Sequence, residues 1–192
     1  MVKRKLNNTE FRLMQGFMKL ADHVYPHVKT RTETFGIKPG QTVVDYGCGP
    51  GRYTVEMARI VGADGKVIAV DLIEMALEET YKKLEAGGFR NYELKLAHGY
   101  DSSIEDNAAD IVFAIDMFHH ISDTNTFLRE VYRILKRDGS LIFSGGHITR
   151  KNVKAKISSS EIWDISEERK EFIAYKQRPI ATLRKYPDQP DQ

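Results

Sequence analysis

Apolar residues gather in short runs that polar turns separate along the first three quarters of the chain. Five of these runs have the length of β-strands. The first is apolar except at its ends, which is typical of a strand buried on both faces. We expect strands at Thr42–Asp45, Lys66–Asp71, Tyr92–Leu96, Ala109–Ile115 and Ser140–Ser144.

Around and between these runs, apolar residues recur at the spacing of amphipathic helices. We expect helices over Glu10–Tyr25, over His27–Phe35, from a glycine-rich stretch to about Val61, over Ile73–Ala86, and from Asp123 to about Lys136. Strand alternating with helix over about a hundred residues predicts right-handed crossovers and a mainly parallel sheet with helices on both faces. The expected fold class is α/β, with a Rossmann-like doubly wound sheet.

The last quarter of the chain breaks this alternation. Residues Asn152–Ile157 form at most a short helix, whereas "EIWDIS" and "KEFIAYKQ" predict two strands of an antiparallel hairpin joined by the charged turn "EERK". The stretch from Arg178 onward holds three of the six prolines and little apolar content, so we expect it to be disordered.

Composition narrows the class of protein. The 192 residues suit one domain, and 41% hydrophobic with 29% charged residues is ordinary for a soluble globular chain. A net charge of +2 gives no nucleic-acid signal, and Cys48, the single cysteine, cannot form an internal disulfide. No apolar run is long enough to span a bilayer, and "MVKRKLNNTEF" lacks the apolar core of a signal peptide. We therefore expect a cytoplasmic protein.

The stretch "VVDYGCGPGRYT" carries the strongest functional signal. It places Gly47, Gly49 and Gly51 between the first strand and the next helix, where missing side chains let a ligand approach backbone amides. Asp71 ends the second strand, where a carboxylate can accept both hydroxyls of a ribose. Together these residues predict a ligand that contains a nucleoside.

Two cofactor classes compete for this turn. The dinucleotide fingerprint is G-x-G-x-x-G, but the spacing here is G-x-G-x-G, and Arg52 stands at the place of the last fingerprint glycine. Asp45, just upstream, would repel a diphosphate but not a cofactor that carries an amino group and no phosphate. The residues therefore favour S-adenosylmethionine over a nicotinamide dinucleotide.

Four motifs in order resemble those of class I S-adenosylmethionine-dependent methyltransferases of the small-molecule type, similar to the ubiquinone and menaquinone biosynthesis methyltransferases. They are "VVDYGCGPG", "VIAVDL", "ADIVFAIDMFHHI" and "FLREVYRILKRDGSLIF", within residues 37–146. The resemblance implies a seven-stranded methyltransferase fold in one domain, residues 1–178. Within it, residues 1–36 would be helices capping the pocket, 37–146 the cofactor-binding core and 147–178 the hairpin, followed by a tail over 179–192.

The resemblance also implies roles for single residues. Asp45, Tyr46 and the turn with Gly47, Gly49 and Gly51 would hold the methionine portion of the cofactor. Asp71 would hold the ribose, with Leu72 packed on the adenine, and Ile115, Asp116 and Met117 would line the pocket near the sulfonium.

Adenine recognition and proton transfer are less sharply marked. "LAHGYD" has His98 where the family usually has an acid, so His98 and the backbone of Gly99 would contact adenine, unless Asp101 does. His119 and His120 follow the fourth strand at the pocket mouth. One of the two would serve as a general base, or both would have only a structural role in helix capping or packing. No metal site is expected, because adjacent histidines rarely converge on one ion.

The predicted function is methyl transfer from S-adenosylmethionine to a small or lipid-like molecule by in-line displacement. The alternatives are a methyltransferase for protein or nucleic acid, a non-catalytic domain that binds S-adenosylmethionine and regulates a partner, and a nicotinamide-dependent oxidoreductase, which the glycine spacing disfavours. The expected partner is a small-molecule substrate of unidentified structure. The sequence does not decide between a monomer and a homodimer.

Overall fold

The computed structural model describes residues 9–10, 13, 16, 27–144 and 149–179. The helix predicted over Glu10–Tyr25 falls mostly outside these residues, as does the tail predicted over 179–192. Within the described ranges, no helix combines the length and the apolar content needed to cross a membrane.

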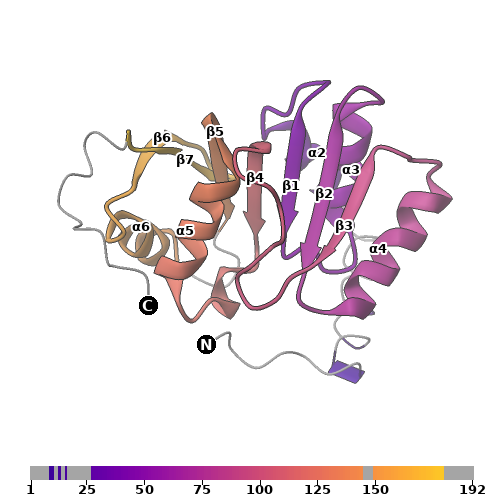
Figure 1. Cartoon of the computed structure of the whole chain (residues 1–192), viewed down its shortest axis with the longest axis horizontal. Helices are drawn as coiled ribbons and strands as arrows, with labels where there is room; N and C mark the ends of the chain where they lie inside the picture. Colours follow the sequence, from indigo (N-terminus) through magenta and orange to yellow (C-terminus); the bar gives the residue numbers. More distant parts are fainter. Residues whose placement is uncertain (1–8, 11–12, 14–15, 17–26, 145–148, 180–192) are drawn as a thin grey trace.

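A seven-stranded sheet, in the order β3-β2-β1-β4-β5-β7-β6, forms the centre of the molecule (Figure 1). The first five strands pair in parallel, and β7 lies antiparallel between β5 and β6. The strands are β1 (Thr42–Tyr46), β2 (Lys66–Asp71), β3 (Tyr92–Leu96), β4 (Ala109–Ile115), β5 (Leu135–Ser144), β6 (Trp163–Glu168) and β7 (Ile173–Gln177). This arrangement confirms the expected doubly wound fold with its antiparallel C-terminal hairpin.

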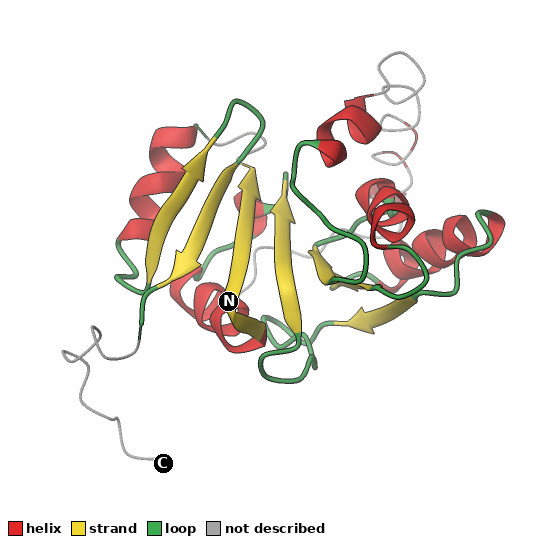
Figure 2. Ribbon diagram, turned by 90° about the horizontal axis from the view of Figure 1, so that it is seen from above, coloured by secondary structure: helices red, strands yellow, loops and turns green. Residues whose placement is uncertain are grey.

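Helices cover both faces of the sheet (Figure 2). One face packs against α2 (His27–Glu33), α3 (Arg52–Val61) and α4 (Glu74–Ala86), and the other against α5 (Thr124–Ile134) and α6 (Arg150–Ser158). Neighbouring strand residues alternate between the two cores, because successive side chains of a strand point to opposite faces. Val43 joins the core that contains Met57 of α3, and Val44 joins the core that contains Phe127 of α5.

The strand order reverses between β1 and β4, which are paired in parallel at the middle of the sheet. Their carboxyl ends lie at the lower edge of the sheet in Figure 1. Ligands of open α/β sheets bind outside the carboxyl ends of the strands at such a reversal. The glycine turn, the end of β2 and the 3₁₀ turn η1 (Phe118–His120) after β4 all lie at this edge.

Several element boundaries differ from the sequence expectation, most of all around the start of β5. Helix α5 ends at Ile134, and β5 begins at Leu135 instead of Ser140, because Leu135 already pairs with Ala109 of β4. The register then shifts before Ser140 pairs with Ile111. The "RDG" that predicts a turn therefore lies in an irregular stretch within β5, and α6 is longer than the short helix expected.

Candidate functional site

All three glycines of the turn have left-handed backbones, with φ angles of 78°, 53° and 72° at Gly47, Gly49 and Gly51. A Cβ on Gly47 would lie 3.1 Å from Cβ and Cγ of Met117. At Gly49, no atom of the described residues other than its two chain neighbours lies within 4 Å of the place of a Cβ. Met117 therefore occupies the space at Gly47, and Gly49 is the turn residue whose missing side chain leaves open space for a ligand.

Gly51 is required by packing within the protein. A Cβ there would lie 2.8 Å from Oγ1 and 3.0 Å from Cα of Thr80 in α4. The Thr80 hydroxyl donates to the carbonyl of Gly49 at 3.0 Å, so α4 braces the turn directly. Approach of a ligand therefore does not explain all three glycines, since Gly51 is explained by its packing against Thr80.

We expect Gly51→Ala to lower the free energy of unfolding by about 2–3 kcal/mol, because it adds a close contact with Thr80 to the cost of a left-handed backbone. Gly88→Ala is the matched control, since Gly88 has a φ of 72° with open space around it. It should cost only about 1–2 kcal/mol. Urea unfolding of both variants measures the difference, and equal losses would show that Thr80 yields to the added methyl group.

Asp71 joins the end of β2 to the glycine turn. One oxygen accepts from the amide of Gly49 at 2.8 Å, and the other accepts from the amide of Ile73 at 2.9 Å. Burial raises the pKa of this carboxyl, although the backbone hydrogen bonds oppose that rise. Each carboxylate oxygen can accept more than one hydrogen bond, so capacity for two ribose hydroxyls remains.

Asp45 lies beneath the turn in β1, with only 3% of its surface exposed. Its carboxylate accepts a hydrogen bond from the hydroxyl of Thr54 at 2.6 Å. Burial is the main cause that raises the pKa of Asp45 to about 6, and the negative charge of Asp71 adds to it. A cation bound above Asp45 would offset this burial cost. The neighbouring Tyr46 is also buried and donates its hydroxyl to the carbonyl of Tyr100 at 2.7 Å.

The segment after β3 carries both candidates for adenine recognition, His98 and Asp101, with exposed side chains. Asp101 and His98 exchange backbone hydrogen bonds of 2.9 and 3.2 Å across Gly99, whose φ is 68°. The Asp101 carboxylate accepts from the amide of Ser103 at 2.8 Å. This local bond uses one oxygen of Asp101, and the exposed side chain of His98 stands beside it. Leu72, partly buried, packs against the apolar core near the end of β2.

The end of β4 carries a polar cluster that the sequence does not indicate. Ile115 is buried, whereas Asp116 has an unusual φ of 55° and an exposed side chain. The hydroxyl of Ser144, at the end of β5, donates to Asp116 at 3.0 Å. Arg31 of α2 donates to the other oxygen of Asp116 at 3.3 Å. Since Arg31 and Asp116 are 85 positions apart, no local motif signals this pair.

The two histidines lie side by side in η1, with ring centroids 3.9 Å apart. His120 is exposed, whereas His119 is partly buried. Within the described ranges, no group of three or more His, Cys, Asp or Glu side chains is arranged to hold a metal ion.

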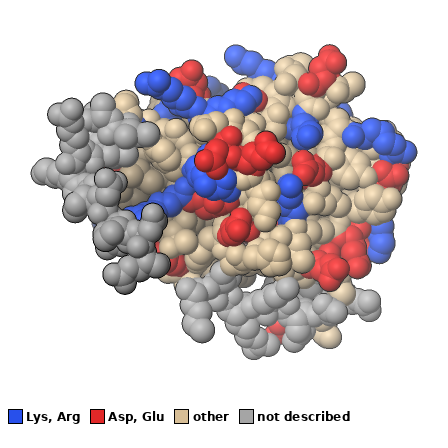
Figure 3. Space-filling view, in the orientation of Figure 1, with Lys and Arg blue, Asp and Glu red and all other residues tan. Residues whose placement is uncertain are grey.

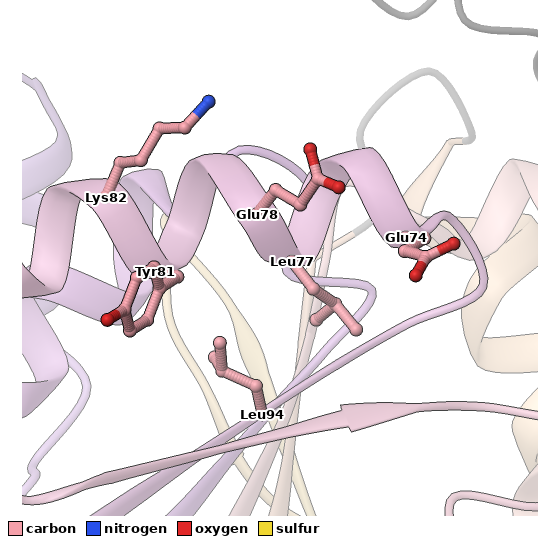
Figure 4. Close-up of a pocket in the computed structure, with 6 residues that line it drawn as sticks. All are labelled: Glu74, Leu77, Glu78, Tyr81, Lys82 and Leu94. Carbon is pink, nitrogen blue, oxygen red and sulfur yellow. The ribbon is translucent and has the colours of Figure 1, made fainter.

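Two hollows in the described surface lie beside α4, and one of them includes Gly51 of the glycine turn. One is formed by Leu94 of β3 and five residues of α4, and Figure 4 shows Leu77, Tyr81 and Leu94 on its inner side, with Glu78 and Lys82 turned outward. The other lies between α2, α3 and α4. Neither contains the end of β4, so we do not assign the reaction to them.

The strand ends fit S-adenosylmethionine, the cofactor that the sequence motifs imply. Gly49 leaves an open approach to the turn, Asp71 offers acceptor capacity for a ribose, and buried Asp45 offers charge for an ammonium group. A diphosphate in the same place would add negative charge beside two carboxylates.

Comparison with known proteins agrees with this fit. A family described as "Methyltransferase domain" matches residues 37–177. The ubiquinone/menaquinone biosynthesis C-methyltransferase of Escherichia coli is 33% identical over 108 residues, which are 56% of this chain and 43% of that protein. The chain therefore matches less than half the length of this curated relative.

Two solved structures share the fold. A Methanococcus maripaludis protein assigned as an S-adenosyl-L-methionine-dependent methyltransferase has a TM-score of 0.74 at 21% identity, covering 93% of this chain and 96% of its own. An S-adenosylmethionine-dependent methyltransferase of Aquifex aeolicus has a TM-score of 0.67 at 23% identity, covering 77% and 86%. The chain belongs to the methyltransferase-domain family, and it shares its fold with these S-adenosylmethionine-dependent methyltransferases.

Proposed function

We propose that this chain transfers a methyl group from S-adenosylmethionine to a small or lipid-like molecule. The observation that carries the proposal is the juxtaposition of an open left-handed glycine, Gly49, with two carboxylates of raised pKa, those of Asp45 and Asp71, at the reversal of strand order. Such a place suits a cationic nucleoside without phosphate.

The bound cofactor supplies a methyl group on a sulfonium that is already a good leaving group. The chain's own task is to bind and orient, which in favourable cases lowers a barrier by roughly 7–11 kcal/mol. The backbone at Gly49 and the Asp71 carboxylate would hold the nucleoside end, and Asp45 the ammonium. Met117 supplies apolar surface beside the turn, and Ile115 anchors the end of β4 in the core.

His119 and His120 remain our candidates for a general base at the pocket mouth. Such a base contributes about 10²–10⁴-fold, and only where the acceptor must lose a proton. The greater exposure of its side chain favours His120 over His119 for this role.

Two observations favour a small acceptor. The Escherichia coli relative, which matches 56% of this chain, is named for ubiquinone and menaquinone biosynthesis. In addition, Lys and Arg side chains are interspersed with Asp and Glu on the face shown in Figure 3. The described part of that face therefore shows no one-signed basic surface of the kind that nucleic-acid binding requires.

Calorimetry and a transfer assay test the proposal together. We expect S-adenosylmethionine and its demethylated product, S-adenosylhomocysteine, to bind, and NAD not to bind. With a labelled methyl group, we expect transfer to the small-molecule or lipid fraction of a cell extract. Binding of NAD alone would refute the cofactor assignment. Transfer to protein or nucleic acid, or tight binding with no transfer to any fraction, would instead favour the corresponding alternatives.

A further inference from the structure

Arg31 contacts four parts of the fold at the carboxyl edge of the sheet. Its guanidinium donates to the hydroxyl of Tyr53 in α3 at 2.7 Å, to the carboxylate of Asp116 after β4 at 3.3 Å, and to the hydroxyl of Ser144 at the end of β5. A fourth bond, of 3.2 Å, goes to the carbonyl of Glu171 before β7. A planar guanidinium suits this task because it presents several donors in a fixed fork.

The order of the strands places this cluster opposite the nucleoside end of the proposed site. Asp71 ends β2, the glycine turn follows β1, and Asp116 and Ser144 end β4 and β5. Along this edge, the ribose would lie over β2 and the amino-acid portion of the cofactor over β1. The next position, over β4 and β5, is left for the molecule that receives the methyl group.

Asp116 is held in place and is still accessible. One oxygen accepts from Ser144 and the other from Arg31, while 43% of the side chain is exposed, against 22% for Arg31. Its φ of 55° is uncommon for a residue other than glycine, and such backbone conformations cluster at functional sites. The cluster thus aims a carboxylate with spare acceptor capacity at the edge of the sheet.

We propose that Asp116 binds the methyl acceptor through a hydroxyl or amine group that donates a hydrogen bond, and that Arg31 is the positioning residue that holds the carboxylate for it. This inference rests on the proposed methyltransferase function and names the chemistry of its acceptor. The acceptor then belongs to the class of hydroxylated or amine-bearing small molecules. A hydroxyl and an amine can both donate a hydrogen bond to the Asp116 carboxylate, and the experiment below distinguishes between them.

Fragment binding to the complex with S-adenosylhomocysteine tests the proposal without turnover. Matched fragments carry a hydroxyl, a primary amine or a methyl group at one position of the same aromatic scaffold. We measure their affinities by ligand-observed NMR for the wild type, Asp116→Asn, Arg31→Met and Arg31→Lys. Arg59→Met is the control, because Arg59 forms an exposed ion pair with Glu33 of α2 away from the strand ends.

We expect the wild type to prefer a donor-bearing fragment over the methyl fragment by about tenfold or more, as for a charge-assisted hydrogen bond. Asp116→Asn should remove most of the preference for an amine and less of that for a hydroxyl, because the amide keeps an uncharged oxygen. Arg31→Met should reduce the preference, Arg31→Lys should restore part of it, and Arg59→Met should leave it unchanged.

Several results would overturn the inference. They are equal binding of all three fragments to the wild type, variants that match Arg59→Met, and a loss of S-adenosylhomocysteine affinity in Asp116→Asn, which would place the carboxylate on the cofactor. If Arg31→Met does not fold, Asp116→Asn decides alone. A wild type that does not bind S-adenosylhomocysteine would refute the proposed function as well, whereas cofactor binding without donor preference refutes only this inference.

Discussion

Asp71→Ala is expected to weaken S-adenosylmethionine binding by about a hundredfold, since two hydrogen bonds to a charged acceptor are each worth about 1.5–3 kcal/mol and part of the loss is recovered by water. The structure adds a second reason. Asp71 also accepts from the amides of Gly49 and Ile73, so its removal releases the turn that the cofactor approaches. The same two amides lose their partner, which should lower the free energy of unfolding by about 1–3 kcal/mol.

Calorimetry at pH 7.5 measures the affinity, and urea unfolding shows that the variant is folded at the temperature used. Asp71→Asn keeps one oxygen acceptor and should fall between the wild type and Asp71→Ala. Glu74→Ala removes an exposed carboxylate three positions along the chain and should leave the affinity unchanged. An unaltered affinity in Asp71→Ala would mean that the cofactor does not lie over β2.

Local sequence patterns predicted the sheet well, because its strands are buried and short and are separated by strong turn signals. Three of the five expected parallel strands, β2, β3 and β4, begin and end where the structure places them. The prediction was wrong at the start of β5. There the "RDG" has the chemistry of a turn, yet Leu135 pairs with Ala109 before the register shifts. A pairing between distant strands overrides local turn preference, and that pairing is not visible in a single segment.

The candidate site divides in the same way. The glycine turn, Asp45 and Asp71 are recognisable because their roles follow from motif spacing along one βαβ unit. The packing contacts that require glycine cannot be seen in the motif itself. Met117, which faces Gly47, is 70 positions away along the chain, and Thr80, which faces Gly51, is 29 positions away. Asp116 is marked by the fourth-strand motif, but its pairing with Arg31 had no sequence signal, because the two residues come from elements that only the tertiary fold brings together.

Asp45→Asn should change stability and cofactor affinity in opposite directions. In the folded protein, burial raises the pKa of Asp45 from an ordinary 3.8 to about 6. Between these two pH values the folded state binds more protons than the unfolded state, so this group's contribution to stability is fully present below pH 3.8 and is lost as the pH rises through 6. The ionised carboxylate therefore costs the protein up to about 3 kcal/mol above pH 6.

The asparagine variant removes this cost and can still accept the hydrogen bond from Thr54. We expect it to be more stable than the wild type by about 1–3 kcal/mol at pH 7.5, with the difference vanishing towards pH 4. Asp123→Asn is the control, because the pKa of this exposed helix-capping carboxyl is shifted in the opposite direction. Hydrogen bonds from Thr126 lower it. Asp123→Asn should not gain stability at pH 7.5.

Cofactor binding should show the converse dependence on pH. If the Asp45 carboxylate holds the ammonium of S-adenosylmethionine, the affinity of the wild type should rise by about tenfold between pH 5 and pH 7, as the fraction of ionised Asp45 increases. Asp45→Asn should bind at least about tenfold more weakly at pH 7.5, with no rise over that range. A flat wild-type profile, or a variant both stabilised and fully able to bind, would show that the burial of Asp45 serves the fold and not the cofactor.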